Sequence, residues 1–227
     1  AYKIMIKDID AVSKVFLRLQ EDGVACIWRP LHEASGAWFW WGIGTAEQYK
    51  ALYKLMYDRM VKDNGVNNCL WVWNIERLNK APYDENVLEA SWYPGDEYCD
   101  FISVDVYKDA NDNGSLSGYF NKIQDLMGSD KMIALSENGP IPDVNNMHKD
   151  GAVWSWWMPW YDSWGDSKFI SQTSNSVWKS NMEDERVITL EDMKDWGTYK
   201  GSVVVDDPCT LNTSVHIEAE CADYKGV

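Results

Sequence analysis

Short apolar segments alternate with helical patterns along the chain, and this alternation constrains the fold more than any other feature. The segments are four to six residues long and predict strands over residues 24–29, 69–73, 101–106, 132–135 and 152–157. Patterns of helical spacing predict a helix ending at residue 21 and helices within 45–62, 85–93, 115–127 and 168–179. Strands separated by helices indicate a parallel α/β sheet, either open or closed into a barrel, because parallel neighbours need a crossover connection.

The length of the chain limits how much of a barrel it can supply. A complete (β/α)8 barrel takes about 250 residues, whereas this chain has 227 residues and five strand-helix units. We therefore expect residues 1–205 to form part of a barrel, with two exposed sheet edges that favour self-association or swapping. Residues 206–227 change to a Val-, Thr- and Ser-rich composition, which predicts a linker and either the start of a β-sandwich module or a plain tail.

Charge and aromatic content narrow the class of partner. The formal net charge is −15 and the Lys and Arg residues are scattered, which argues against nucleic acids and anionic membranes as partners. No apolar run approaches the roughly 18 residues of a membrane span. The 14 Trp and 12 Tyr residues greatly outnumber the five Phe residues. Flat rings with one polar atom suit sugar binding, although many of these Trp residues are also expected in the core.

The five cysteines do not indicate a metal or redox centre, because no two of them have CxxC spacing. Cys26, Cys69 and Cys99 lie in or beside apolar runs and are expected to be buried. Pairing of Cys209 with Cys221 stays open. No cofactor is expected.

Polar residues follow several of the predicted strands, and two of them are glutamates. Glu33 follows the first strand and Glu137 follows the fourth. The carboxyl ends of parallel strands meet at one edge of a sheet, where such folds present their reacting groups. Two carboxylates in an aromatic setting fit glycoside hydrolysis, in which one donates a proton and the other attacks the anomeric carbon.

The surroundings of the two glutamates predict different roles. Glu33 lies beside His32, Trp38 and Trp41, and apolar surroundings raise the pKa of a carboxyl group. Hydrogen bonds from strand-end neighbours such as Tyr107 would favour the ionised form of Glu137. These patterns predict Glu33 as the acid/base and Glu137 as the nucleophile.

Two longer runs carry a family resemblance. The run RPLHEASGAWFWWG covers residues 29–42, and the run ALSENGPIP covers residues 134–142. Together with WYPGD at residues 92–96, they closely resemble glycoside hydrolase family 26, whose best-known members are endo-β-1,4-mannanases. The resemblance implies a (β/α)8 TIM barrel that retains anomeric configuration, of which this chain carries about the last five strand-helix units.

The same resemblance implies roles for individual residues. Glu33 matches the acid/base after the fourth strand of the family and Glu137 matches the nucleophile after the seventh. The residues implied in substrate binding are His32, Trp38, Trp41, Tyr107 and Trp156, with Trp156 favoured over Trp157. By the same analogy, His32 hydrogen-bonds either the substrate or Glu33. Arg29 and Asn74 are either scaffolding of the site or structural caps of strand ends.

The expected function is that of a secreted, retaining endo-β-1,4-mannanase acting on mannan, glucomannan or galactomannan. The alternatives are a β-glucanase or xylanase of the same family, and a non-catalytic polysaccharide-binding fragment. No metal, nucleic-acid or membrane partner is expected.

Overall fold

The computed structural model describes residues 1–128, 131–160 and 172–193. The predicted linker and module at residues 206–227, and with them Cys209 and Cys221, lie outside the described residues. The chain divides into two compact units. The described part of the smaller unit consists of residues 1–26 and 56–69, and the larger unit holds residues 27–55 and 70–193.

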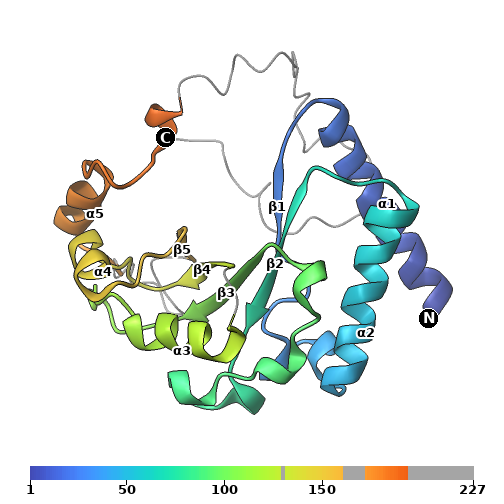
Figure 1. The fold of residues 1–227 in the computed structure, drawn as a ribbon, viewed down its shortest axis with the longest axis horizontal. Helices are drawn as coiled ribbons and strands as arrows, with labels where there is room; N and C mark the ends of the chain where they lie inside the picture. The colour runs from blue at the N-terminus through green and yellow to red at the C-terminus, as the bar shows by residue number, and fades with distance from the viewer. Residues whose placement is uncertain (129–130, 161–171, 194–227) are drawn as a thin grey trace, which may run out of the picture. The chain divides into compact units, whose positions relative to one another are not determined.

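A five-stranded parallel sheet organises the larger unit, as the alternation of strands and helices predicts (Figure 1). The strand order is the order in the sequence. The strands are β1 Cys26–Trp28, β2 Cys69–Ile75, β3 Phe101–Val106, β4 Met132–Asn138 and β5 Trp157–Pro159. This arrangement is part of a (β/α)8 barrel, so the predicted fold class is confirmed.

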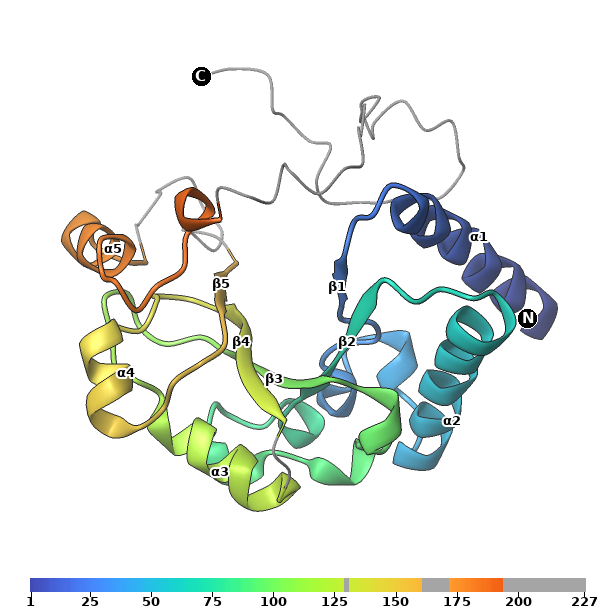
Figure 2. The same ribbon diagram turned by 45° about the horizontal axis from the view of Figure 1, so that its top comes forward.

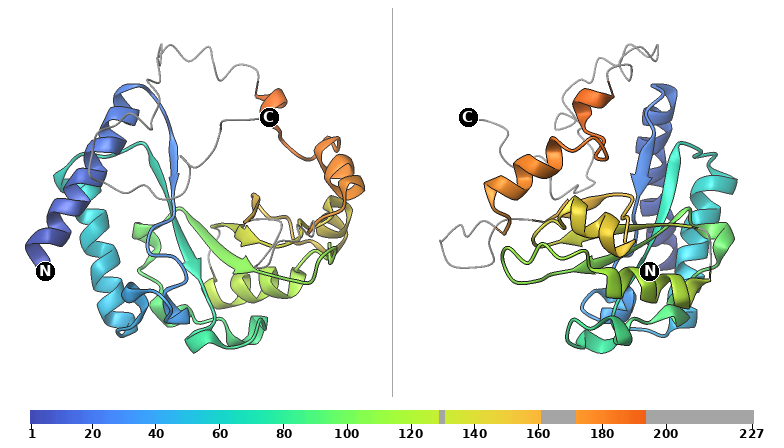
Figure 3. Two further views of the ribbon diagram at one scale, coloured as in Figure 1. Left: turned by 180° about the vertical axis from the view of Figure 1, so that it is seen from behind. Right: turned by 60° about the vertical axis from the view of Figure 1, so that its left-hand side comes forward.

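The middle of the sheet is buried on both faces, as expected for parallel strands covered by helices. Every residue of β3 is buried, and so are the last five residues of β2 and the last six of β4. Figures 2 and 3 show α3 and α4 on the same outer side of these strands. A rigid layer of this kind fixes the positions of the side chains that project from the strand ends.

The helices of the larger unit follow the strands along the chain. They are α2 Ala46–Tyr57, whose last two residues belong to the smaller unit, α3 Ser117–Met127, α4 Val144–Asp150 and α5 Asn175–Met182. Helix α3 buries Tyr119, Phe120 and Ile123, and the Phe120 ring packs edge-on against Trp154, 5.1 Å away between centroids. The Trp154 indole donates to the Ser115 carbonyl at 2.8 Å, which ties the start of α3 to the segment before β5.

The smaller unit contains helix α1 Tyr2–Glu21 and the π-helical turn Asp58–Asp63. The Arg59 guanidinium binds both carboxylate oxygens of Asp10, at 2.7 and 2.9 Å. Asn64 also donates to Asp10, at 2.9 Å, and the two hydrogen-bond donors lower the pKa of Asp10 to about 2. None of the described helices is long and apolar enough to cross a membrane.

One predicted helix is absent from the structure, and one observed helix was not predicted. The helix expected within residues 85–93 is wrong, because only the short 3-10 turns Glu85–Val87 and Ala90–Trp92 form there. The side chains of Asp84 and Glu89 each accept a hydrogen bond from the backbone N–H two residues later, which caps each turn separately. Helix α4 was not predicted, since its seven residues are too few to give a clear period.

The elements at the end of the described chain are also displaced from their predicted positions. The last strand is Trp157–Pro159, whereas residues 152–157 were expected. Helix α5 runs from Asn175 to Met182, and Ser174 caps it by accepting from the backbone N–H of Val177. Residues 168–171 of the expected helix lie outside the described residues. Among the cysteines, Cys99 is buried as expected, but Cys26 and Cys69 are only partly buried.

Candidate active site

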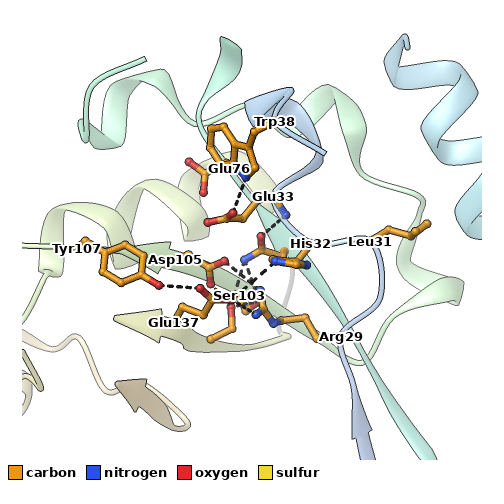
Figure 4. Close-up of polar contacts among 12 residues, drawn as sticks. Arg29, Leu31, His32, Glu33, Trp38, Glu76, Ser103, Asp105, Tyr107 and Glu137 are labelled. Carbon is orange, nitrogen blue, oxygen red and sulfur yellow. Dashed lines mark hydrogen bonds and ion pairs between the residues drawn. The ribbon is translucent and has the colours of Figure 1, made fainter. Parts of the chain in front are cut away.

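The carboxyl ends of four neighbouring strands bring polar side chains together in the larger unit (Figure 4). Arg29 directly follows β1, Asn74 and Asp105 lie near the ends of β2 and β3, and Glu137 lies near the end of β4. Glu33 enters the cluster from the loop after β1. The parallel sheet thus places the two predicted catalytic glutamates at one edge, as expected.

The loop after β1 has an unusual backbone. Leu31, Glu33 and Ala37 all have left-handed conformations, with φ of 52°, 51° and 61°. Such conformations cost energy in residues other than glycine and persist only where the surroundings hold them. Here the Glu33 backbone N–H donates to Asn74 Oδ1 at 2.7 Å, and the Trp41 indole donates to the His32 carbonyl at 2.8 Å. Both bonds hold the peptide unit between His32 and Glu33, so the backbone is fixed directly before the glutamate side chain.

Two glycines make room for this loop. A Cβ atom on Gly36 would lie 2.2 Å from the Trp38 ring, and one on Gly42 would lie 2.0 Å from the carbonyl oxygen of Ala34. Neither distance is compatible with a side chain, since backbone and ring would have to move apart. The glycines in the run at residues 29–42 thus allow the tight packing that aims Trp38 at Glu33.

Glu33 lies in a buried and mainly acidic environment. Glu33 is 8% exposed, and its Oε2 atom accepts a hydrogen bond from the Trp38 indole N–H at 2.7 Å. Burial, followed by the negative charges of Asp105, Glu76 and Glu137, raises the pKa of Glu33 to about 8. The carboxyl group consequently holds its proton at neutral pH, which is the state that a general acid needs.

Glu137 lies among hydrogen-bond donors instead. The Tyr107 hydroxyl donates to its Oε2 at 2.7 Å, and the Arg29 guanidinium binds its Oε1. The other arm of Arg29 binds Asp105 Oδ2 at 2.9 Å, so one planar cation connects two buried carboxylates. This arrangement fixes the orientation of Glu137 and stabilises its negative charge.

A β-bulge helps to aim the residues of β4. Val104 pairs with Leu135 but Asp105 pairs with Glu137, so Ser136 is an extra residue in β4. In a regular strand Ser136 and Glu137 would point to opposite faces, and a bulge redirects side chains at such a position. Both side chains here join the same polar cluster, since Ser136 donates to Asp105 Oδ1 at 2.6 Å.

Asn74 links the loop after β1 to β4. Its Oδ1 accepts from the Glu33 backbone, and its Nδ2 donates to the Ser136 hydroxyl at 3.1 Å. Asn74 is 3% exposed and Ser136 is equally buried, so these bonds are protected from water. Of the two roles predicted for Arg29 and Asn74, the contacts of both residues correspond to scaffolding of the site.

The remaining predicted site residues lie at different distances from the glutamates. The His32 Nε2 atom is 3.9 Å from Glu137 Oε1, too long for a hydrogen bond. Burial, followed by the charge of Arg29, lowers the pKa of His32 to about 4, so the ring is neutral at pH 7. Trp41 stacks on Phe39 with centroids 4.5 Å apart and supports the loop.

The structure does not bring Trp156 together with the other predicted residues. Its ring packs against Phe101, with centroids 4.9 Å apart, and Phe101 is the first residue of β3. The glutamates gather at the opposite ends of the strands. The predicted role of Trp156 in substrate binding therefore has no contact in its favour among the described residues.

Glu76 belongs to the site but was not singled out from the sequence. It follows the last residue of β2 and is 2% exposed. Its carboxylate, with those of Glu33 and Asp105, forms a group whose ligand-type oxygen atoms lie within 4.8 Å of one another. The predicted strand ends at Trp73, whereas β2 extends to Ile75. A predicted strand that extended to Ile75 would have placed Glu76 at the strand end, where a charged residue is a candidate for the active site.

The arrangement thus combines a protonated carboxyl group with a second carboxylate held by donors, at one edge of a parallel sheet. Such a pair can donate a proton to a leaving oxygen and supply a nucleophile.

Similarity to known proteins identifies the family. The sequence model named Glycosyl hydrolase family 26 matches residues 1–191. A mannan endo-1,4-β-mannosidase from Thermothelomyces thermophilus is 38% identical over 197 residues, which are 86% of this chain and 37% of that protein. The chain therefore spans little more than a third of the length of this relative.

Solved structures show the same relationship. A GH26-CBM35 β-(1,4)-mannanase from Podospora anserina has a TM-score of 0.72 and 35% identity, over 86% of this chain and 40% of that one. A β-mannanase from a symbiotic protist of the termite Reticulitermes speratus, solved with a gluco-manno-oligosaccharide, has a TM-score of 0.73 and 35% identity, over 86% and 56%. With a family match over most of its length and relatives of this similarity, the chain belongs to glycosyl hydrolase family 26.

Proposed function

We propose that the protein is a retaining endo-β-1,4-mannanase, with Glu33 as the acid/base and Glu137 as the nucleophile. The observation that carries the proposal is the contrast between the two glutamates. Glu33 is buried among other acids and keeps its proton, whereas Glu137 is bound by Arg29 and Tyr107. Family membership and the mannan endo-1,4-β-mannosidase activity named for its relative support mannan as the substrate class.

In the first step Glu33 gives its proton to the glycosidic oxygen while Glu137 attacks the anomeric carbon, which forms a glycosyl-enzyme. In the second step Glu33, now ionised, takes a proton from water as the water displaces Glu137. This mechanism requires carboxyl groups about 5–5.5 Å apart. Glu137 is one of the charges that raise the pKa of Glu33, which supports a short distance between the two carboxyl groups.

The surrounding side chains have supporting roles in the proposal. Trp38 and Tyr107 orient the two catalytic carboxyl groups and border the sugar that lies between them. Neutral His32 offers a ring nitrogen beside Glu137. Trp41 acts through the loop that it anchors, and Trp156 is the weakest of the proposed sugar contacts. Because a polysaccharide cannot enter a cell, we also propose that the enzyme is secreted.

Single substitutions in the full-length protein test the catalytic roles. Glu137→Gln and Glu33→Gln keep the size of each side chain and should each lower kcat on mannan at least 1000-fold. Glu97→Gln, the same change at an exposed glutamate before β3, is the matched control and should leave kcat unchanged. Wild-type turnover by Glu137→Gln would remove the nucleophile assignment.

Two further measurements separate the finer parts of the proposal. The anomer formed first, followed by NMR, is β if configuration is retained and α if it is inverted. Reducing-sugar release from mannan, glucomannan and galactomannan, compared with mixed-linkage glucan and xylan, decides between the mannanase and the glucanase or xylanase alternatives. Calorimetric binding of mannohexaose without turnover would instead indicate a non-catalytic binding protein.

A further inference from the structure

Glu76 is a fully enclosed acid that the proposed mechanism does not use. Its backbone carbonyl accepts the Ser35 hydroxyl at 2.9 Å, which ties the end of β2 to the loop that carries Glu33. Its Oε1 accepts both the backbone N–H of Arg77, at 2.8 Å, and an Arg77 guanidinium N–H, at 2.9 Å. Its Oε2 is buried and has no hydrogen-bond partner among the described residues.

The position of Arg77 explains why only one oxygen of Glu76 is satisfied. The guanidinium lies over the Tyr83 ring, 3.7 Å from its centroid, and 5.2 Å from the centroid of Trp38. These two rings hold the cation on the side of Oε1. Glu76 also belongs to the carboxylate group with Glu33 and Asp105, in which one oxygen of each residue lies within 4.8 Å of the others, and Figure 4 shows the Glu76 carboxyl beside that of Glu33.

A buried carboxylate oxygen without a donor is costly, and such an atom calls for an explanation. Substrate is excluded as the missing partner, because Glu76 is 2% exposed and a sugar hydroxyl cannot reach it. Asp105 does not supply it, because its pKa of about 6 leaves the carboxyl group ionised at pH 7, and its two oxygens accept from Arg29 and Ser136. The acidic hydrogen of a neighbouring carboxyl group is the remaining donor within this cluster.

We infer that Glu76 is a positioning residue, which shares the catalytic proton with Glu33 and so keeps the acid/base protonated between turnovers. The inference rests on the proposed role of Glu33. Two carboxyl groups that share one site cannot readily both ionise, so the last proton is held to a higher pH than either group alone would hold it. Glu76 donates nothing to the substrate itself.

The electrostatic setting supports this reading. Burial, reduced by the hydrogen bond and charge of Arg77, raises the pKa of Glu76 to about 8, the same value as for Glu33. The pair therefore holds protons at neutral pH in spite of Arg77. The other charged and titratable groups that act on the pair are Arg29, Asp105, Glu137, Tyr83, Tyr107 and Tyr119.

The Trp38 indole provides a direct probe of this proton, because its N–H donates to Glu33 Oε2. In ¹⁵N-labelled full-length protein, the indole resonance of Trp38, assigned by its loss in Trp38→Phe, should shift with pH as Glu33 ionises. Glu76→Gln removes the neighbouring charge at constant size and should move the midpoint of this shift down by about one pH unit. An unchanged midpoint would overturn the inference.

Two control variants separate charge from shape. Glu76→Asp retains the charge with a shorter side chain and should keep the midpoint close to that of the wild type. Glu97→Gln removes an exposed charge and should have no effect. If Glu76→Asp and Glu76→Gln move the midpoint equally, the effect is structural and the inference is wrong. A midpoint that depends on added Ca²⁺, relative to EDTA, would show a cation site instead of a shared proton.

The pH dependence of activity is a second measurement, and it distinguishes a failure of the Glu76 inference from a failure of the proposed function. The basic limb of kcat/KM on mannan reports the proton of the free acid/base, so Glu76→Gln should move this limb down by the same amount as the indole midpoint. If Glu33→Gln abolishes the indole titration but not turnover, the proposed function fails while the carboxyl pair remains. If turnover needs Glu33 but Glu76→Gln leaves both midpoints unchanged, only the role of Glu76 fails.

Discussion

The two glutamates that we propose as catalytic have opposite kinds of surroundings. Glu33 lies on a strained loop, is packed against an indole and has other acids as neighbours. Glu137 lies on a buried strand, beside a bulge, and is bound by a cation and a phenol. The different environments alone would suit the same residue type to proton donation on one side of the site and to nucleophilic attack on the other, as the proposed mechanism requires.

The backbones that carry the two glutamates also differ. The Glu137 side depends on a parallel sheet, whose register is set by the burial of its apolar residues. The acid/base side depends on three residues with positive φ and on glycines that admit Trp38. The loop after β1 is therefore more sensitive to substitution than the sheet. Changes in this loop should alter the protonation of Glu33 before they alter the fold.

The largest expected effect on stability comes from removing the Arg29 guanidinium, which binds both Asp105 and Glu137. Arg29→Met leaves Asp105 and Glu137 buried without a positive partner. Loss of one partner of a buried ion pair costs about 3–5 kcal/mol, so the free energy of unfolding at pH 8 should fall by that amount in urea titrations.

The control for this change is Arg18→Met, at an exposed position on α1, which should alter stability by less than about 0.5 kcal/mol. The loss in Arg29→Met should shrink at pH 5, where the unpaired carboxylates can take up protons. Equal losses at both pH values would show that Arg29 acts by packing rather than by charge.

Substitution of the two glutamates should change the free energy of unfolding in opposite directions. The pKa of Glu33 is about 8 in the folded protein, above its ordinary value of 4.5, so the folded state loses stability as pH rises from about 4.5 to 8. Glu33→Gln removes this penalty and should stabilise the protein at pH 9 by on the order of 2 kcal/mol. Glu137→Gln loses the ion pair with Arg29 and should destabilise it.

Thermal and urea unfolding at pH 4 and pH 9 check this contrast. The gain from Glu33→Gln should disappear at pH 4, where the wild-type carboxyl is protonated in both the folded and unfolded states. A gain that is independent of pH would mean that Glu33 is destabilising for reasons of packing. Stabilisation by both substitutions would remove the asymmetry between the two glutamates.

Much of this architecture could be predicted from the sequence, because the buried strands carry their own signal. Apolar runs at residues 101–106 and 132–135 fall on β3 and β4, and the glutamates that follow the first and fourth strands lie at one edge of the sheet. The hydrogen bond from Tyr107 to Glu137 also follows from the meeting of strand ends. Helical patterns were least reliable where side chains cap single turns, as at Asp84 and Glu89.

The missed features share one cause, which is that they depend on tertiary contacts. The Ser136 bulge has no local sequence signal, since it arises from register with β3. Glu76 reads as an ordinary charged residue after a strand until its burial is known. The direction of the Trp156 side chain depends on where β5 starts, because successive residues of a strand point to opposite faces. The sequence pattern does not distinguish Trp156 from the adjacent Trp157.

The smallest expected effect tests whether each donor acts only on its own glutamate. The Trp38 indole lowers the pKa of Glu33 by donating to it, so Trp38→Phe should raise the basic limb of kcat/KM by about half a pH unit. Tyr107→Phe removes the donor to Glu137 and should lower kcat about tenfold or more without moving that limb. If Tyr107→Phe moves the basic limb as far as Trp38→Phe does, the two halves of the site titrate as one unit.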